Sequence, residues 1–242
     1  MSVPYLNPHI LDFPNLTSAL KEPNGLLAAG GSLSKDWLLE AYSRGIFPWY
    51  EDGQPILWWS PDPRLILIPE HFRASRSLRK LLRKGIYKVS FNKSFSDVLD
   101  GCRTNNRKYE GTWITDEMAN AYKNLHHIGV AHSVEVWSSE TLVGGLYGIA
   151  LGKVFFGESM FSEVDNSSKI ALLYLVLHLK EWGFKLIDCQ VRSEHLLSLG
   201  AIEIPRSKFT GMLPFLVRNG EKIGDWRIKE QLIEKEFKCN EK

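Results

Sequence analysis

Proline, glycine and aromatic residues interrupt the hydrophobic pattern of the first part of the chain at short intervals, in FPNL, EPNGLLAAGG, RGIFPWY and WWSPDPR. One amphipathic helix fits between these breaks, over residues 34–44, where apolar side chains recur at helical spacing before a glycine. This pattern predicts a small α+β lobe closed by short turns. Because Pro61 and Pro63 mark a boundary, we expect a small N-terminal domain over residues 1–64 and a second domain over residues 65–242.

The rest of the chain contains longer periodic segments. Helical spacing predicts helices over residues 75–84 and 116–128, and the apolar run SSKIALLYLVLHLKEWG predicts a buried helix that ends at Gly183. Shorter apolar or alternating runs predict strands in LILIP, HSVEVW, LVGGLYGIAL, KVFFGESMF, KLIDCQV and near IPRSKF, and HLLSLGA predicts a short helical piece. The charged tail from Glu221 onward is expected to be solvated.

The order of these elements predicts the fold class. Antiparallel strands followed by a strand–helix–strand crossover are typical of an α+β protein with an N-acetyltransferase-like mixed sheet. A regular crossover makes KVFFGESMF and KLIDCQV parallel neighbours. We therefore expect a ligand to bind where the ends of these two strands diverge.

Polar residues on these two strands are the strongest candidates for chemistry. Strand period 2 places Asp188 and Gln190 on one face of KLIDCQV and Cys189 on the other, and it aligns Glu158 with Met160 in FFGESMF. One interpretation is structural, with Asp188 and Gln190 hydrogen-bonding a neighbouring loop. The other is an acid/base group beside an amide that orients a carbonyl. Two carboxyls in one apolar pocket would split their pKa values or attract a cationic substrate group.

Other catalytic chemistries find little support in the sequence. Cys189 has no histidine or asparagine at a recognisable spacing to activate it as a nucleophile, and the seven histidines show no metal-binding motif. The turn SEVDNSSKIA lacks the glycines that cradle the diphosphate of coenzyme A. We therefore expect no metal and no cofactor.

Charge is balanced overall, with 30 basic and 28 acidic residues, but residues 71–93 carry eight Lys/Arg and no acidic residue. The predicted helix there exposes Arg76, Arg79, Lys80, Arg83 and Lys84. Such a face is either simply solvated or a contact for nucleic-acid phosphates, and nearby aromatics such as Trp49 and Trp113 either stack on a base or fill the core. Three cysteines without C-x-x-C spacing, no signal-peptide pattern and no bilayer-length apolar run predict a cytoplasmic protein.

The motifs KEPNGLLAAGG, RGIFPWY, PILWWSPDPR, EGTWIT, AHSVEVW, LVGGLYGIA, GESMFS, SSKIALL and KLIDCQV together resemble the leucyl/phenylalanyl-tRNA–protein transferase family, in order and from about Phe13 to Phe209. The resemblance implies transfer of Leu or Phe, and less well Met, from aminoacyl-tRNA to the N-terminal Arg or Lys of a protein. That product enters bacterial N-degron degradation. The resemblance also implies an acetyltransferase-like C-terminal domain that uses neither metal nor coenzyme A.

The resemblance also assigns site residues. The family's catalytic pair falls on Asp188 and Gln190. The pocket for the transferred side chain falls on Leu146, Phe155, Glu158, Met160, Leu172 and Leu175. The aromatics at the terminal adenosine fall on Tyr42, Trp49, Trp113 and Tyr122. Leu146 and Leu175 stand where some members have methionine and phenylalanine, so the preference between Leu and Phe is expected to shift.

We expect the enzyme mainly to align an already activated ester with an amine. In this hypothesis Gln190 accepts a hydrogen bond from the α-amine, while Asp188 holds Gln190 and takes up the proton. Glu158 or Asp188 would favour a basic acceptor side chain, and the basic helix would hold the acceptor-stem phosphates of tRNA. We expect a monomer. The rival interpretations are a transferase that adds amino acids to cell-wall precursors, a coenzyme A-dependent acetyltransferase and a non-catalytic RNA-binding module.

Overall fold

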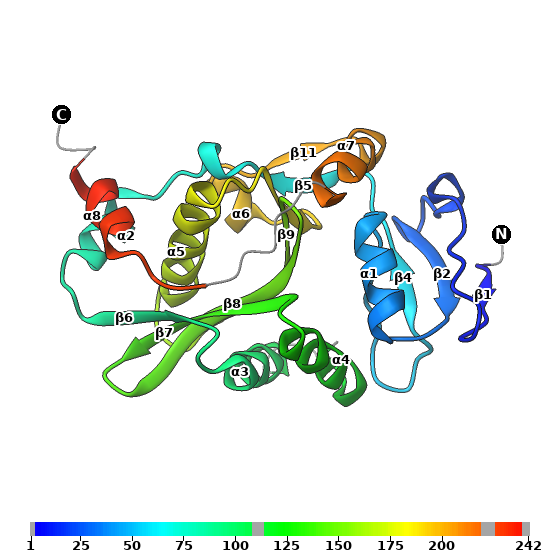
Figure 1. Cartoon of the computed structure of the whole chain (residues 1–242), viewed down its shortest axis with the longest axis horizontal. Coiled ribbons are helices and arrows are strands. Elements are labelled where there is room, and N and C mark those ends of the chain that lie inside the picture. Colours follow the sequence, from blue (N-terminus) through cyan, green and yellow to red (C-terminus); the bar gives the residue numbers. More distant parts are fainter. Residues whose placement is uncertain (1–2, 108–113, 219–225, 239–242) are drawn as a thin grey trace.

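The computed structural model describes residues 3–107, 114–218 and 226–238. Its N-terminal part forms a four-stranded sheet with the order β1-β2-β4-β3. The strands are β1 (Tyr5–Leu6), β2 (Leu26–Gly30), β3 (Phe47–Pro48) and β4 (Leu57–Trp59). The predicted helix is α1 (Lys35–Ser43), which Gly45 follows with φ +77°. Figure 1 shows this lobe at one end of the molecule.

Aromatic side chains form the core of this lobe. The Trp58 side chain is fully buried, its indole N–H donates to the Gly30 carbonyl at 2.8 Å, and its ring packs edge-on against Phe13. Trp37 of α1 completes the cluster. Trp58 is therefore a core residue, and its polar N–H is satisfied as a buried indole requires.

The larger sheet has seven strands in the order β11-β5-β10-β9-β8-β7-β6. In chain order these are β5 (Arg64–Leu67), β6 (Tyr87–Phe91), β7 (Ala131–Ser138), β8 (Thr141–Leu151), β9 (Val154–Ser162), β10 (Leu186–Gln190) and β11 (Ile202–Ile204). β9 and β10 pair in parallel, and the other neighbours pair antiparallel. The predicted α+β class with a mixed sheet and one strand–helix–strand crossover is thus confirmed.

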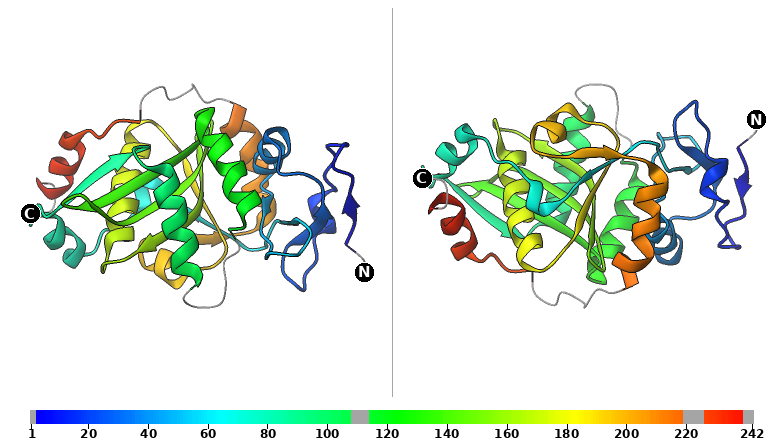
Figure 2. Two further views of the ribbon diagram at one scale, coloured as in Figure 1. Left: turned by 90° about the horizontal axis from the view of Figure 1, so that it is seen from below. Right: turned by 90° about the horizontal axis from the view of Figure 1, so that it is seen from above.

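Helices cover both faces of this sheet (Figures 1 and 2). The crossover helix α5 (Ser167–Glu181) lies on one face and is buried along most of its length, because ten of its fifteen residues are buried. On this face α5 contacts α2 (Arg76–Leu82) and α8 (Glu230–Lys238). The opposite face carries α3 (Phe95–Arg107) and α4 (Asp116–His127). α1 packs against α4 and α7 (Arg206–Arg218), which joins the N-terminal lobe to the larger sheet.

Short elements complete the chain. They are the single turns η1 (Leu16–Ser18) and η2 (Pro69–His71) and the helix α6 (Glu194–Ser198). None of the helices in the described ranges combines the length and the apolarity that a membrane span needs.

The predicted final strand forms but lies earlier in the chain than expected, and the prediction of a solvated tail is wrong. The strand near IPRSKF stops at Ile204, and α7 follows, because the Pro205 carbonyl accepts the first bonds of that helix from Lys208 and Phe209. The tail is not fully solvated, since Trp226, which precedes α8, and Ile233 of α8 are buried in the cluster that includes the α5 face. Leu232, Ile233 and Phe237 stand at helical spacing, so the segment does carry a helical pattern, which its many charged residues obscured.

Candidate active site

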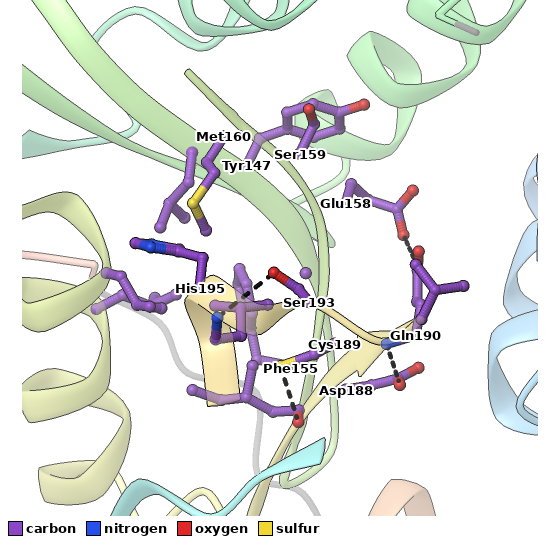
Figure 3. A pocket seen from close by; sticks show the side chains of 17 residues that line it. Tyr147, Phe155, Glu158, Ser159, Met160, Asp188, Cys189, Gln190, Ser193 and His195 are labelled. Carbon is purple, nitrogen blue, oxygen red and sulfur yellow. Dashed lines mark hydrogen bonds between the residues drawn. The ribbon is translucent and has the colours of Figure 1, made fainter. Parts of the chain in front are cut away.

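A cavity of about 320 Å³ opens where β9 and β10 diverge. Apolar side chains from β8, β9 and α5 line most of it, and Figure 3 shows Met160 and His195 on one side with Glu158, Gln190 and Asp188 on the other. The structure brings together at this cavity all six residues expected to form the side-chain pocket: Leu146, Phe155, Glu158, Met160, Leu172 and Leu175. The site is therefore an apolar pocket with a polar corner.

The end of β10 departs from the regular alternation that the sequence predicted. The register shifts between Asp188 and Gln190, and Gln190 has a φ of +63° in the left-handed region. Its backbone N–H donates to Asp188 Oδ1 at 3.0 Å. Asp188, Cys189 and Gln190 all line the cavity as a result. Burial raises the pKa of the Cys189 thiol, which makes this residue a poor nucleophile.

Asp188 is held by an arginine that the sequence analysis did not single out. Arg64 Nε donates to Asp188 Oδ1 at 2.8 Å and Arg64 Nη2 to Asp188 Oδ2 at 2.6 Å, and both side chains are fully buried. The guanidinium lies between the rings of Phe47 and Phe209, at 4.9 and 4.8 Å from their centroids. The sequence does contain a signal for this pair, because Arg64 directly precedes the apolar run LILI and a buried charge requires a partner.

Glu158 occupies the other half of the polar corner. Gln190 Nε2 donates to Glu158 Oε1 at 2.9 Å. Tyr42 Oη donates to the same oxygen at 2.8 Å, and Tyr122 Oη donates to Oε2 at 2.6 Å. Burial raises the pKa of Glu158 to about 7, against the lowering effect of these hydrogen bonds and with a smaller raising effect from Asp188. The two carboxyls therefore differ, since an arginine pairs with Asp188 and hydroxyls surround Glu158.

The aromatics expected at the terminal adenosine lie in different surroundings. Tyr42 of α1 and Tyr122 of α4 are fully buried, and their hydroxyls face Glu158. Trp49 is 41% exposed and lies beside Trp59, whose indole N–H donates to the Trp49 carbonyl. Trp113 lies outside the described residues. A stacking surface for a base is therefore available at Trp49 but not at the two tyrosines.

His132 and His126 pack against aromatic rings, whereas His195 lines the cavity. His132 stacks on Trp226 at 3.7 Å between centroids, and burial lowers the pKa of His132 to about 3. His126 stacks on Phe95. His195 of α6 lines the cavity, and its buried Nε2 has no partner within the described part of the chain. Across residues 3–107, 114–218 and 226–238, no His, Cys, Asp and Glu cluster with metal-binding geometry occurs.

The basic helix forms as predicted, because the Ser75 hydroxyl accepts from the Leu78 N–H at its start. Arg76, Lys80, Arg83 and Lys84 are exposed. Arg79 is partly buried and pairs with Glu236 of α8 at 3.0 Å. Four of the five cations expected on this face are exposed.

Comparisons with known proteins show what this chain resembles. The family model of the leucyl/phenylalanyl-tRNA protein transferase matches residues 66–214, and the model of its N-terminal domain matches residues 31–62. A protein of Cellvibrio japonicus named leucyl/phenylalanyl-tRNA–protein transferase is 56% identical to this chain, and the match covers 87% of this chain and 90% of that protein. A protein of the same name from Nitrosospira multiformis is 53% identical, and the match covers 96% of this chain and 100% of that protein. FemX, a solved structure, overlaps 71% of this chain and 66% of its own at 13% identity and a TM-score of 0.45.

These matches place the chain among the acyltransferases. More narrowly, it belongs to the leucyl/phenylalanyl-tRNA–protein transferase family.

Proposed function

We propose that this chain transfers Leu or Phe, and less readily Met, from aminoacyl-tRNA to the N-terminal Arg or Lys of a protein, which marks that protein for N-degron degradation. We further propose that it acts in the cytoplasm as a monomer, and that the residues up to about 64 form a small domain beside the catalytic one. The single observation that carries the proposal is the cavity, which joins an apolar pocket to an oriented amide and carboxyls.

The apolar part of the cavity fits the side chain of the amino acid being transferred. Leucine, phenylalanine and methionine are unbranched at Cβ and gain by leaving water, whereas a charged side chain would lose its hydration there. Branching at Cβ in valine and isoleucine would conflict with the shape of a narrow pocket. The pocket thus favours a small set of large apolar donors.

Gln190 supplies the group that orients the acceptor amine. An ionised carboxylate only accepts hydrogen bonds, so Glu158 fixes the Gln190 amide with its NH₂ toward Glu158. Gln190 Oε1 is then left to accept from the α-amine, and the Asp188 carboxylate holds the backbone of the same residue. Orientation of this kind is a large contribution when the ester is already activated.

Charge supports a basic acceptor. Two carboxyls and one guanidinium leave the polar corner negative whenever Glu158 is ionised. An arginine or lysine side chain next to the attacking amine offsets that charge, whereas an alanine does not. The exposed cations of α2 would hold the tRNA backbone through its phosphates, which carry no sequence information and suit several tRNAs.

Transfer of labelled Phe from charged tRNA to two peptides that differ only at the N-terminus tests this proposal. We expect product with N-terminal Arg and none with N-terminal Ala. Equal labelling of both peptides would contradict the acceptor specificity. Tight tRNA binding without any product would favour the RNA-binding alternative instead.

A further inference from the structure

Glu158, Tyr42 and Tyr122 form a closed ring of short oxygen contacts. The Tyr42 and Tyr122 hydroxyls lie 2.7 Å apart, Tyr42 Oη lies 2.8 Å from Glu158 Oε1, and Tyr122 Oη lies 2.6 Å from Glu158 Oε2. All three distances are those of hydrogen-bonded oxygen pairs. Each of them therefore calls for one proton between its two oxygens.

The three contacts of this ring can hold one more proton than the two tyrosine hydroxyls supply. Each tyrosine hydroxyl carries a single proton, and an ionised carboxylate carries none. Two protons serve three contacts when Glu158 is ionised, so one contact is left without a hydrogen. A proton added to Glu158 completes the third hydrogen bond without moving any heavy atom.

The surroundings favour this position over its neighbour. Asp188, on the adjacent strand, is already paired with Arg64 through both oxygens. Glu158 is partly buried, and within the described chain its side-chain partners are the neutral groups of Tyr42, Tyr122 and Gln190. The other titratable groups acting on it are Asp188 and, from β8, the buried phenol of Tyr147. Glu158 also lines the cavity that would hold the amine.

We propose that Glu158 is the catalytic group that receives the proton of the attacking amine, with Tyr42 and Tyr122 as positioning residues that adjust its proton affinity. This inference rests on the proposed aminoacyl transfer, and it replaces the expectation that Asp188 takes up the proton. Asp188 acts instead as a fixed anchor for Gln190.

The uncharged α-amine attacks the ester carbonyl carbon, a C–N bond forms and the C–O bond to the ribose breaks. The nitrogen loses one proton to Glu158, and the departing ribose oxygen takes one proton from Glu158. The products are an amide and a free hydroxyl, and Glu158 returns to its ionised form.

The pH dependence of single-turnover transfer tests this role in Tyr42→Phe and Tyr122→Phe. Each substitution removes a donor that stabilises ionised Glu158, so the pKa of Glu158 rises from about 7 and less of it is ionised in acid. The acid limb of the rate profile should therefore move upward by about one to two pH units, the size of a hydrogen bond to a charged group. Ionisation of the peptide's α-amine is the same with every enzyme variant. It therefore cancels when the rate of a variant is divided by the wild-type rate at the same pH.

Tyr174→Phe is the matched control, because Tyr174 is a buried tyrosine of α5 that borders a separate hollow near α8. It should leave the acid limb in place. An unmoved limb in both Tyr42→Phe and Tyr122→Phe, with thermal unfolding unchanged, would overturn the role of Glu158 while transfer itself persists. Absence of transfer by the wild type at every pH would instead contradict the proposed function, and the inference would fall with it.

Discussion

Arg64 shows how a single buried residue holds the polar corner together. It is fully buried, binds both oxygens of Asp188 and lies between two aromatic rings from different parts of the chain. Arg64→Met would leave the Asp188 carboxylate buried without its partner. Breaking such a pair costs about 3–5 kcal/mol, so we expect a loss of that size in urea unfolding together with loss of transfer.

Arg192→Met is the control for that variant. Arg192 bonds Glu194 and Glu203 on the surface, where an ion pair contributes little. Its stability and transfer should match the wild type. Equal stability of Arg64→Met and the wild type would contradict the anchoring role.

Leu175 tests the pocket at the same scale. It lines the cavity from α5, and a larger ring there would narrow the space for the transferred side chain. Leu175→Phe should lower kcat/KM for Phe-tRNA relative to Leu-tRNA by about tenfold, the scale of one excess group in an apolar pocket. Leu11→Phe, on the exposed N-terminal segment, should leave the ratio unchanged, and an unchanged ratio in Leu175→Phe would place the donor elsewhere.

At the residue scale the sequence predicted the polar corner but not its partners. Strand alternation in KLIDCQV and FFGESMF was enough to single out Asp188, Gln190 and Glu158 as unusual on apolar strands. Arg64 was missed because its partner lies 124 residues away, and pairing at that distance leaves no local signal. The bulge after Asp188 was missed for the same reason, since it is set by β5 across the sheet.

Among the elements, helix α2 is the candidate contact for tRNA. Reversing the charge of Arg76, Lys80 and Lys84 together should weaken binding of charged tRNA and flatten its salt dependence, because each lost phosphate contact removes about one from the slope of log K against log salt. Filter binding at several salt concentrations measures this slope. The exposed Lys21→Glu is a single-charge control, and an unchanged slope in the triple variant would place the tRNA on another surface.

The packing of the C-terminal segment around helix α8 can be tested at Trp226. Trp226, just before it, stacks on His132 and contacts Phe91 and Trp182. Trp226→Ala should lower the free energy of unfolding by about 3–5 kcal/mol, as for other buried aromatics. Phe215→Ala, which removes an exposed aromatic, should cost much less, and equal losses would mean that the segment does not pack as described.

The crossover was predictable from its pattern, whereas helix α3 and strand β6 were not predicted. The crossover helix and the strands on either side of it follow from an apolar run too long for a strand and from alternation around it. α7 and α8 carry mixed sequences whose apolar residues are meaningful only once the sheet and α5 offer a surface. Tertiary contacts decide those segments.

For the whole molecule, the active site depends on both sheets. Tyr42 of α1, in the N-terminal lobe, donates a hydrogen bond to Glu158 of the larger sheet. Phe47 of β3, in the same lobe, packs against Arg64 of the larger sheet. The N-terminal lobe is therefore part of the site rather than a separate attachment. An architecture of this kind positions the amide, the two carboxyls and the apolar pocket together, which is what alignment of an ester and an amine requires.

Single-turnover transfer of Phe by Gln190→Met tests whether the Gln190 amide orients the attacking amine. Methionine has a similar length and keeps the backbone bond to Asp188 possible, but it removes the amide that orients the amine. We expect a loss of about 10²–10⁴-fold in the rate of transfer, with binding of charged tRNA unchanged. Transfer at the wild-type rate would contradict this role.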